Sequence, residues 1–257
     1  MPRLAANLTM MFTDRPFLER FAAAAACGFK AVEFLFPYDE TPDAVAEARR
    51  AAGLEIALFN LPAGDFAGGE RGLAALTGRD ADFAESLDRA LLYAQALQAK
   101  RLHVMAGIAP AENRPRYVER LGLAADFFAP HDIHLTIEPI NLRDMPGYHL
   151  SLQEDALSVL RAVGRSNLTL QMDFYHCQIM QGDLTRRLEA NQDQIGHLQI
   201  AGVPDRHEPD SGEVAYDRLL AHLDSLGYDG WVGCEYRPRG LTEAGLGWAA
   251  DYGIAAP

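Results

Sequence analysis

The chain has 257 residues, of which 49% are hydrophobic and 23% charged, a composition typical of globular proteins and not of disordered ones. Its 36 acidic residues outnumber its 23 basic ones, which gives a formal net charge of −13. Because no run of Lys or Arg forms a basic patch, this charge disfavours nucleic acid as a partner.

The sequence also argues against membrane insertion and secretion. Its apolar stretches are far shorter than the roughly 20 residues that a membrane-spanning helix needs, and its first residues lack the pattern of a secretory signal. Cys27, Cys177 and Cys234 are scattered and form no CxxC pair, so neither a disulfide framework nor a thiolate zinc site is indicated. We therefore expect a cytoplasmic protein that does not contact a membrane.

Short apolar runs alternate along the chain with longer stretches rich in Ala, Leu, Glu and Arg. The apolar runs predict strands at residues 4–8, 31–35, 55–60, 101–105, 134–138, 168–173, 197–200 and 231–235. The longer stretches predict helices at residues 15–27, 42–52, 80–98, 116–129, 152–163, 183–191, 216–226 and 242–250. This strict alternation of strand and helix favours a parallel sheet with crossover helices.

A glycine separates a predicted helix from the next predicted strand at Gly28, Gly53 and Gly227. Glycine accepts the left-handed conformation that ends helices, so its recurrence there indicates a repeated unit. The rival architecture, a doubly wound open sheet, usually has about five or six strands and a GxGxxG run after the first strand, which is missing here. We therefore expect an α/β fold with one domain over residues 1–257, a (β/α)₈ TIM barrel, which typically takes about 250 residues.

Long connections follow the third, fifth and seventh predicted strands, at residues 60–79, 139–151 and 201–214. In a barrel of this kind they would lie on the catalytic face, and connections of such length inside a compact domain are usually functional or mobile.

Polar side chains end four consecutive predicted strands, at Glu138, Asp173, Gln199 and Glu235. A carboxylate buried at such a position costs several kcal/mol unless something compensates its charge. Taken singly, each could cap the next helix or pair with an arginine. Together, three carboxylates and one amide oxygen facing one mouth predict a site for one divalent cation, Mg²⁺ or Mn²⁺, and disfavour zinc.

Four further residues are candidates for binding a substrate. His176, three residues after Asp173, is placed either to contact substrate beside the metal or to make a local hydrogen bond. Arg206, in the long connection after the seventh strand, is expected to grip an anionic substrate by a bidentate bond. Glu33 lies in the second predicted strand and Asn60 ends the third, where either would hold a substrate hydroxyl or order the loops.

Two carboxylates that flank a carbonyl and its neighbouring hydroxyl can move a proton between adjacent carbon atoms. A metal ion that binds both oxygens stabilises the enediolate that develops. Glu138 and Glu235 are suited to approach from different sides as acid and base. We favour this proton transfer through a cis-enediol, while a metal-assisted hydride shift would use much the same scaffold.

Seven segments spread over the whole chain resemble the hydroxypyruvate isomerase family of the xylose isomerase-like TIM barrels. They are Ala-Asn-Leu-Thr-Met-Met-Phe at 6–12, Val-Glu-Phe-Leu-Phe-Pro-Tyr at 32–38, Asn-Leu-Pro-Ala-Gly-Asp at 60–65, Gly-Glu-Arg-Gly at 69–72, Ile-Glu-Pro-Ile-Asn at 137–141, Gly-His-Leu-Gln-Ile-Ala at 196–201 and Gly-Cys-Glu-Tyr at 233–236. The resemblance implies an isomerase of the aldose–ketose type with Glu138, Asp173, Gln199 and Glu235 as metal ligands. It also implies that Glu138 and Glu235 are the acid/base pair.

The family resemblance implies a small hydroxy-oxo acid as the substrate. Hydroxypyruvate isomerase interconverts hydroxypyruvate and tartronate semialdehyde, and the sister 2-oxo-tetronate isomerases convert 2-oxo-tetronate to 3-oxo-tetronate. Residues 137–141 and 146–149 resemble the first branch, whereas 204–210 and 238–248 resemble the second. We favour the four-carbon acid and keep hydroxypyruvate as the alternative. A homo-oligomer is compatible with these features.

Other activities of the same superfamily fit less well. A ketose 3-epimerase of free sugars resembles this pattern in its two glutamates, but usually has His where Gln199 stands. AP endonuclease-like phosphodiesterases bind several metals through many histidines, which are sparse at the strand ends of this acidic chain. A ligand-binding barrel without catalysis would have no need of the complete set of metal-ligand residues.

Overall fold

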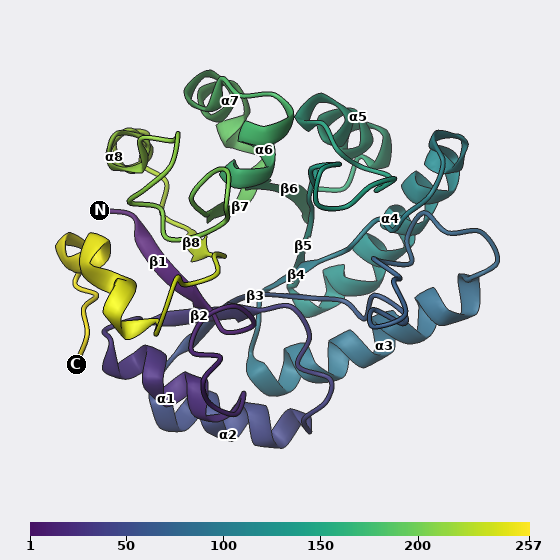
Figure 1. The fold of residues 1–257 in the computed structure, drawn as a ribbon. Coiled ribbons are helices and arrows are strands. Elements are labelled where there is room, and N and C mark those ends of the chain that lie inside the picture. The colour runs from purple at the N-terminus through teal and green to yellow at the C-terminus, as the bar shows by residue number, and fades with distance from the viewer.

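Eight strands pair in parallel in their sequence order, and the eighth pairs with the first, so that the sheet closes into a barrel (Figure 1). The structure is a computed structural model that describes residues 1–257. The strands are β1 (Arg3–Asn7), β2 (Ala31–Phe34), β3 (Glu55–Asn60), β4 (Arg101–His103), β5 (His134–Ile137), β6 (Leu168–Asp173), β7 (Ile195–Ile200) and β8 (Trp231–Cys234). The predicted TIM barrel is confirmed, with every strand boundary within two residues of its prediction.

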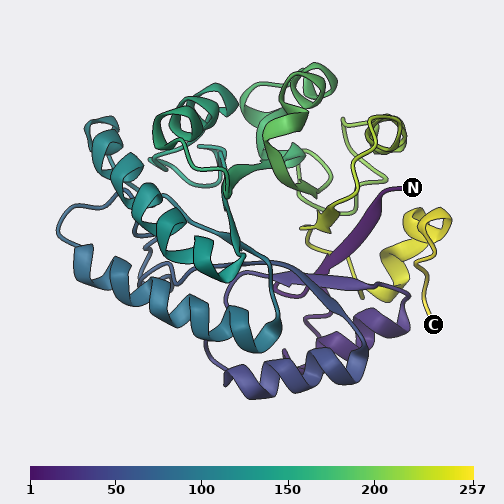
Figure 2. The same ribbon diagram turned by 180° about the vertical axis from the view of Figure 1, so that it is seen from behind.

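The helices lie around the outside of the barrel, as the views from both sides show (Figures 1 and 2). They are α1 (Glu19–Ala26), α2 (Pro42–Ala52), α3 (Asp80–Leu97), α4 (Arg114–Phe128), α5 (Gln153–Val163), α6 (Phe174–Met180), α7 (Leu184–Asn191) and α8 (Tyr216–Ser225). Short 3₁₀ segments are η1 (Ala111–Asn113), η2 (Ala129–His131) and η3 (Gln192–Gln194), and a longer one, η4 (Glu243–Tyr252), follows β8. None of the helices has the length and apolar character needed to span a bilayer.

The structure departs from the predicted helices in three places. Helix α1 begins at Glu19 and not at residue 15, because the preceding residues form turns with i→i+3 hydrogen bonds. The last predicted helix is the 3₁₀ segment η4, which contains Gly245 and Gly247, residues with low α-helix propensity. Helix α6, directly after β6, is an additional helix that was not predicted from the sequence.

Local signals in the sequence explain where the outer helices begin and end. Helix α2 is an example: the side chain of Thr41 accepts the Ala44 N–H at its start, and Pro42 occupies the first turn. Gly53 ends it in the left-handed conformation at φ +67°. The apolar side chains of such helices pack against the strands in one cluster of 70 buried residues. This continuous core holds the strand ends, and hence the polar residues there, in fixed positions.

The long connections at the carboxyl end of the barrel are joined to neighbouring strands. The one after β3 pairs at Gly72 with Ala106, just beyond β4, and Ile108 pairs with Tyr148 in the connection after β5. These bridges place loop residues over the barrel mouth, opposite the end at which the strands begin.

Candidate active site

A cavity of about 420 Å³ opens at the carboxyl ends of the strands. It is lined by Asn7, Thr9, Met10, Phe34, Leu35, Leu58, Asn60, Phe66, Arg71, His103, Met105, Glu138, Ile140, Asp144, Met145, Gln171, His176, Gln199, Arg206, Glu235 and Arg237. Six of the eight residues singled out from the sequence therefore face one space: Asn60, Glu138, His176, Gln199, Arg206 and Glu235.

Two carboxylate oxygens in the centre of the site have no hydrogen-bond partner. They are Oε1 of Glu138, just after β5, and Oδ2 of Asp173, the last residue of β6. Both are buried, and they lie 3.7 Å and 3.6 Å from Nε2 of His176 on α6. The other oxygen of Asp173, Oδ1, accepts the N–H of Tyr175 at 2.7 Å and so caps α6. Asp173 thus caps α6 with one carboxylate oxygen and keeps the other without a hydrogen bond.

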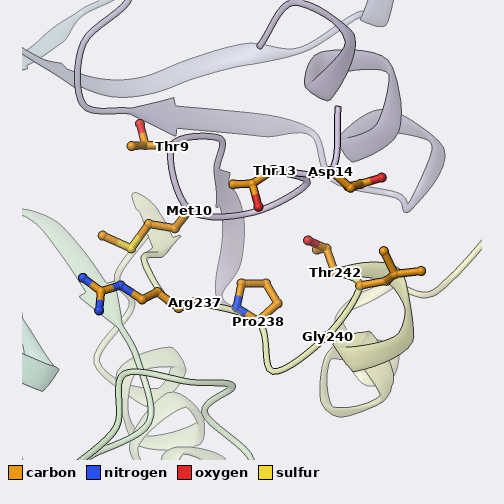
Figure 3. A pocket seen from close by; sticks show the side chains of 9 residues that line it. Thr9, Met10, Thr13, Asp14, Arg237, Pro238, Gly240 and Thr242 are labelled. Carbon is orange, nitrogen blue, oxygen red and sulfur yellow. The ribbon is translucent and has the colours of Figure 1, made fainter. Parts of the chain in front are cut away.

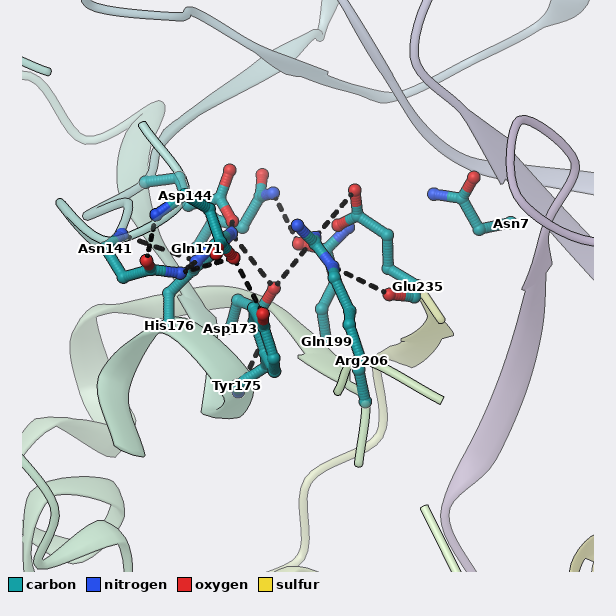
Figure 4. A network of polar contacts seen from close by, with 12 residues as sticks. Asn7, Asn141, Asp144, Gln171, Asp173, Tyr175, His176, Gln199, Arg206 and Glu235 are labelled. Atoms are coloured by element: carbon teal, nitrogen blue, oxygen red, sulfur yellow. Dashed lines mark hydrogen bonds and ion pairs between the residues drawn. The ribbon is translucent and has the colours of Figure 1, made fainter. Parts of the chain in front are cut away.

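His176 is oriented by a polar network from the connection after β5 (Figure 4). Its Nδ1 lies 2.6 Å from the side-chain nitrogen of Asn141 and 3.3 Å from the Asn141 backbone nitrogen. Asn141 also donates to Asp144, which accepts the hydroxyl hydrogen of Tyr175 at 2.7 Å. Since Asn141 offers only N–H donors there, Nδ1 is the acceptor and Nε2 carries the hydrogen of the neutral ring. That N–H points toward Glu138 and Asp173.

Arg206 stands between two carboxylates from different strands (Figure 4). Its Nη2 lies 3.2 Å from Oε1 of Glu235 and 3.6 Å from Oδ2 of Asp173. Its guanidinium carbon lies 4.9 Å from the centre of the Tyr175 ring, and the side chain is 12% exposed. In this arrangement an incoming substrate anion would compete with two protein carboxylates for Arg206.

Burial raises the pKa of all three carboxyls in this cluster, because the charged form loses its hydration. The pKa of Asp173 rises to about 6 and that of Glu235 to about 8, with nearby Arg206 acting against burial in both. The pKa of Glu138 is raised well above its usual range by burial and by the charges of Glu235 and Asp173. Burial and Arg206 hold the pKa of His176 well below its usual value.

Gln199 lies beside Asp173, since these residues are partners in the pairing of β7 with β6. Its amide nitrogen donates to Oε1 of Glu33 at 2.8 Å, and its amide oxygen accepts from Gln171 at 2.7 Å. Glu33 also accepts from Asn7 and lies 2.7 Å from Nε2 of His197. The structure therefore places Glu33 beneath the cavity as a fully buried acceptor, rather than among the residues that line it.

Several cavity residues were not found from the sequence. Gln171 lies two residues before Asp173, so the period of two along a strand could have identified it. His103 also lines the cavity, with Nδ1 at 3.7 Å from Oε2 of Glu138. Burial lowers the pKa of His103 to about 3, so its ring is neutral. Arg71 lies in a loop, where the sequence has no helix or strand periodicity. The glycines on either side of Glu70 and Arg71 are the only local feature that marks this position.

The donor set fits a divalent cation. Buried carboxylate oxygens without partners are unfavourable, and Glu138 and Asp173 each have one. Atoms that could serve as metal ligands and lie within 4.8 Å of one another belong to Glu138, Asp173 and His176. Of the other two predicted ligands, Glu235 contacts Arg206 and Gln199 accepts from Gln171. Oxygen-rich sites of this kind suit Mg²⁺ and Mn²⁺.

A closed parallel barrel with clustered carboxylates at the carboxyl ends of its strands defines a TIM-barrel enzyme. The model of the xylose isomerase-like TIM barrel family matches residues 21–252. The chain is 54% identical to a 2-oxo-tetronate isomerase of Cupriavidus necator, over 98% of this chain and 99% of that protein. It is 45% identical to hydroxypyruvate isomerase of Escherichia coli, over 98% of this chain and 100% of that protein.

A crystal structure from Brucella melitensis, described as an AP endonuclease of family 2, is 50% identical and superposes with a TM-score of 0.96. The overlap covers 98% of this chain and 99% of that one. The chain belongs to the hydroxypyruvate isomerase family, including its 2-oxo-tetronate isomerase branch, within the xylose isomerase-like TIM barrels. It is an isomerase, and the resemblance inferred from the sequence is confirmed.

Proposed function

We propose that the protein isomerises a small hydroxy-oxo acid, converting 2-oxo-tetronate to 3-oxo-tetronate. The observation that carries this proposal is that Glu138 and Glu235, from β5 and β8, line one cavity with raised pKa values. Relatives named 2-oxo-tetronate isomerase at 54% and 47% identity support the four-carbon acid. Hydroxypyruvate is the second candidate, supported by the relative at 45% identity.

In this proposal Glu138, Asp173, Gln199 and Glu235 hold one Mg²⁺ or Mn²⁺ ion. When bound, such an ion draws electron density from the carbonyl and hydroxyl oxygens of the substrate and so acidifies the C–H bond beside the carbonyl. The buried oxygens of Glu138 and Asp173 that accept no hydrogen bond support this assignment.

One glutamate removes the proton from C3 of the substrate, which gives a cis-enediol, and the other delivers a proton to C2. The hydroxyl proton passes from the C3 oxygen to the C2 oxygen. The carbonyl group thus moves from C2 to C3, and substrate and product are isomers. A carboxyl with a raised pKa can both accept and return a proton near neutral pH, as Glu235 with a pKa of about 8 illustrates. A hydride shift between C3 and C2 is the alternative route to the same product.

Polar neighbours orient the substrate between these glutamates. The Nε2–H of His176 and the guanidinium of Arg206 point toward the carboxylate cluster, where they would donate to substrate oxygens. Asn60, which lines the cavity, would hold a hydroxyl. Glu33 acts from below by accepting from Gln199.

The proposal is tested by incubating the protein with 2-oxo-tetronate, hydroxypyruvate and free ketoses, with Mg²⁺, with Mn²⁺ and with excess chelator, and following products by proton NMR. We expect the four-carbon acid to give the highest kcat/KM and chelation to abolish turnover without unfolding the barrel. Full turnover in chelator with no residual metal would remove the cation from the proposal. Turnover of free ketoses alone would replace it by epimerase or sugar isomerase activity.

A further inference from the structure

Two arginines of the cavity, Arg71 and Arg237, have no carboxylate partner in the structure. Both line the cavity, and neither side chain forms an ion pair, whereas Arg206 is engaged by Glu235 and Asp173. A cavity that takes an anionic substrate needs a cation whose charge the protein has not already neutralised. Arg71 and Arg237 are the two cavity arginines that meet this condition.

Arg71 is held in place by groups that leave its charge free. Its Nη1 donates to the backbone oxygens of Phe66 and Glu70 at 2.7 Å and 2.8 Å. Its guanidinium carbon lies 4.1 Å from the centre of the Phe66 ring, which packs in turn against Phe36 at 4.9 Å. These contacts occupy Nη1 and one face of the guanidinium group. The edge formed by Nε and Nη2, which can pair with a carboxylate through two parallel bonds, has no partner.

The loop that carries Arg71 is fixed to the barrel immediately after it. Gly72 pairs with Ala106, and its N–H donates to the oxygen of Ala63 at 3.1 Å. A Cβ at Gly72 would lie 2.3 Å from the backbone oxygen of Met105, and φ is +120°, so only glycine fits this close approach. The Gly-Glu-Arg-Gly run at 69–72 thus has a structural reason, which is to hold Arg71 over the cavity.

Arg237 is less well prepared for the same task. It is exposed, and its side chain makes no hydrogen bond or ion pair. It extends between the main cavity and a neighbouring one of about 330 Å³ lined also by Thr9, Thr13 and Thr242 (Figure 3). Binding through Arg237 would have to order a free side chain, which costs conformational entropy that the pre-ordered Arg71 does not lose.

We infer that Arg71 binds the carboxylate of the substrate acid through Nε and Nη2 and so gives this site its preference for an acid over a neutral ketose. The inference rests on the proposed function and adds to it the orientation of the substrate in the cavity. The carboxylate lies toward the connection after β3, and the two reacting carbons lie between Glu138 and Glu235.

The test is isothermal titration of the protein with 2-oxo-tetronate, hydroxypyruvate and the neutral ketose erythrulose, with Mg²⁺ and again with chelator. Erythrulose has a hydroxymethyl group where the four-carbon acid has its carboxylate. We expect Arg71→Gln to weaken binding of both acids by about 10- to 100-fold, with or without metal, and to leave erythrulose unchanged. Arg71→Lys should lie between, because it keeps the charge and loses the fork.

Two variants separate this role from alternatives. Arg79→Gln breaks the ion pair of Arg79 with Glu70 in the same loop without changing the cavity, and acid preference should persist. Arg237→Gln removes the same charge from the cavity and should weaken the acids less than Arg71→Gln does. The inference is overturned if Arg79→Gln abolishes the preference, if Arg237→Gln has the larger effect, or if the wild type binds neither acid. Tight, Arg71-dependent binding of acids without turnover would sustain it and refute the proposed isomerisation.

Discussion

Gln199 of β7 donates its amide N–H across the barrel interior to Oε1 of Glu33 on β2, at 2.8 Å. The amide can take only this orientation, because its oxygen accepts from Gln171, whose own oxygen accepts the hydroxyl hydrogen of Thr136. The orientation of the Gln199 amide is therefore fixed by hydrogen bonds within the protein, with its oxygen toward Gln171 and its nitrogen toward Glu33. Glu33, which is buried below the cavity, thus helps to determine that Gln199 keeps its amide oxygen, and not its amide nitrogen, on the side away from Glu33.

Gln199→Glu is expected to lower the stability of the metal-free protein and to tighten divalent-cation binding. The new carboxylate would face Glu33 without a donor between them, which should cost about 3 kcal/mol in unfolding free energy. The added negative charge should strengthen Mn²⁺ binding and slow turnover, since the cation polarises the substrate less. Urea denaturation and calorimetric Mn²⁺ titration measure both effects. Gln178→Glu, at the half-buried C-terminal end of α6, is the matched control, because its amide also donates to a glutamate, Glu213, but nearer the surface. Equal behaviour of the two variants would contradict the assignment.

Glu138→Gln and Glu235→Gln should each keep measurable Mn²⁺ binding and lose about 10²-fold or more in kcat, the usual scale of general acid–base catalysis. Gln retains an oxygen ligand but cannot accept the proton. In D₂O the wild type should incorporate deuterium at the product carbon, because the transferred proton passes through an exchangeable carboxyl. Glu47→Gln, on the outer helix α2, should behave as wild type. Product free of deuterium under all conditions would favour the hydride shift and leave both glutamates as ligands.

The stability of the metal-free protein should fall as the pH rises from 6 to 8. The folded protein holds a proton on Glu235 up to a pKa of about 8, whereas the unfolded chain releases it near the ordinary glutamate value. The folded state thus binds more protons in this window, and the resulting stabilisation is lost as the pH increases, by about 2 kcal/mol. Glu235→Gln should show a flatter pH profile in urea denaturation. A wild-type profile that rises over the same window would contradict the raised pKa.

Added Mg²⁺ or Mn²⁺ should oppose this loss of stability at higher pH. A cation binds the deprotonated carboxyls, so it should raise the melting temperature more at pH 8 than at pH 6. Differential scanning fluorimetry with and without the ion checks the sign. A larger shift at pH 6 would show that protons do not compete with the cation at this cluster.

Tyr117→Phe should stabilise the protein by about 1 kcal/mol, because it removes a buried hydroxyl that has no hydrogen-bond partner. The ring packs edge-on against His149 at 5.3 Å, a contact that Phe keeps. Tyr93→Phe is the control, since the Tyr93 hydroxyl donates to the oxygen of Glu40 at 2.6 Å and its loss should destabilise. The melting temperatures of the two variants are measured by thermal denaturation. A shift of both in the same direction would contradict the prediction that only the Tyr117 hydroxyl is unfavourable.

The barrel could be predicted because strand and helix patterns alternate along the whole chain, and glycines mark the ends of α1, α2 and α8. Helix α6 could not, because it has only seven residues, which follow β6 without a break, and its first four residues are all buried, so no amphipathic period marks it. Its only local signal is Asp173, whose cap role is hidden by its place at a strand end.

The same contrast holds for the site. The sequence singles out Glu138, Asp173, Gln199 and Glu235 because a polar residue at the end of a buried strand is conspicuous. The contacts of these residues could not be predicted, because they depend on how the loops fold over the barrel. Arg206 lies between Asp173 and Glu235 because of the conformation of its loop, which the sequence pattern does not indicate.

The pairing of β1 with β8 has a consequence for how the chain folds during synthesis. Arg3 donates to the backbone oxygen of Asp229, 226 residues later, and the register runs from Arg3 opposite Trp231 to Ala6 opposite Cys234. One edge of β1 must therefore remain unpaired on the ribosome until nearly the whole chain has emerged. Exposed strand edges invite pairing with other chains, so the nascent protein is vulnerable to aggregation until this last contact forms.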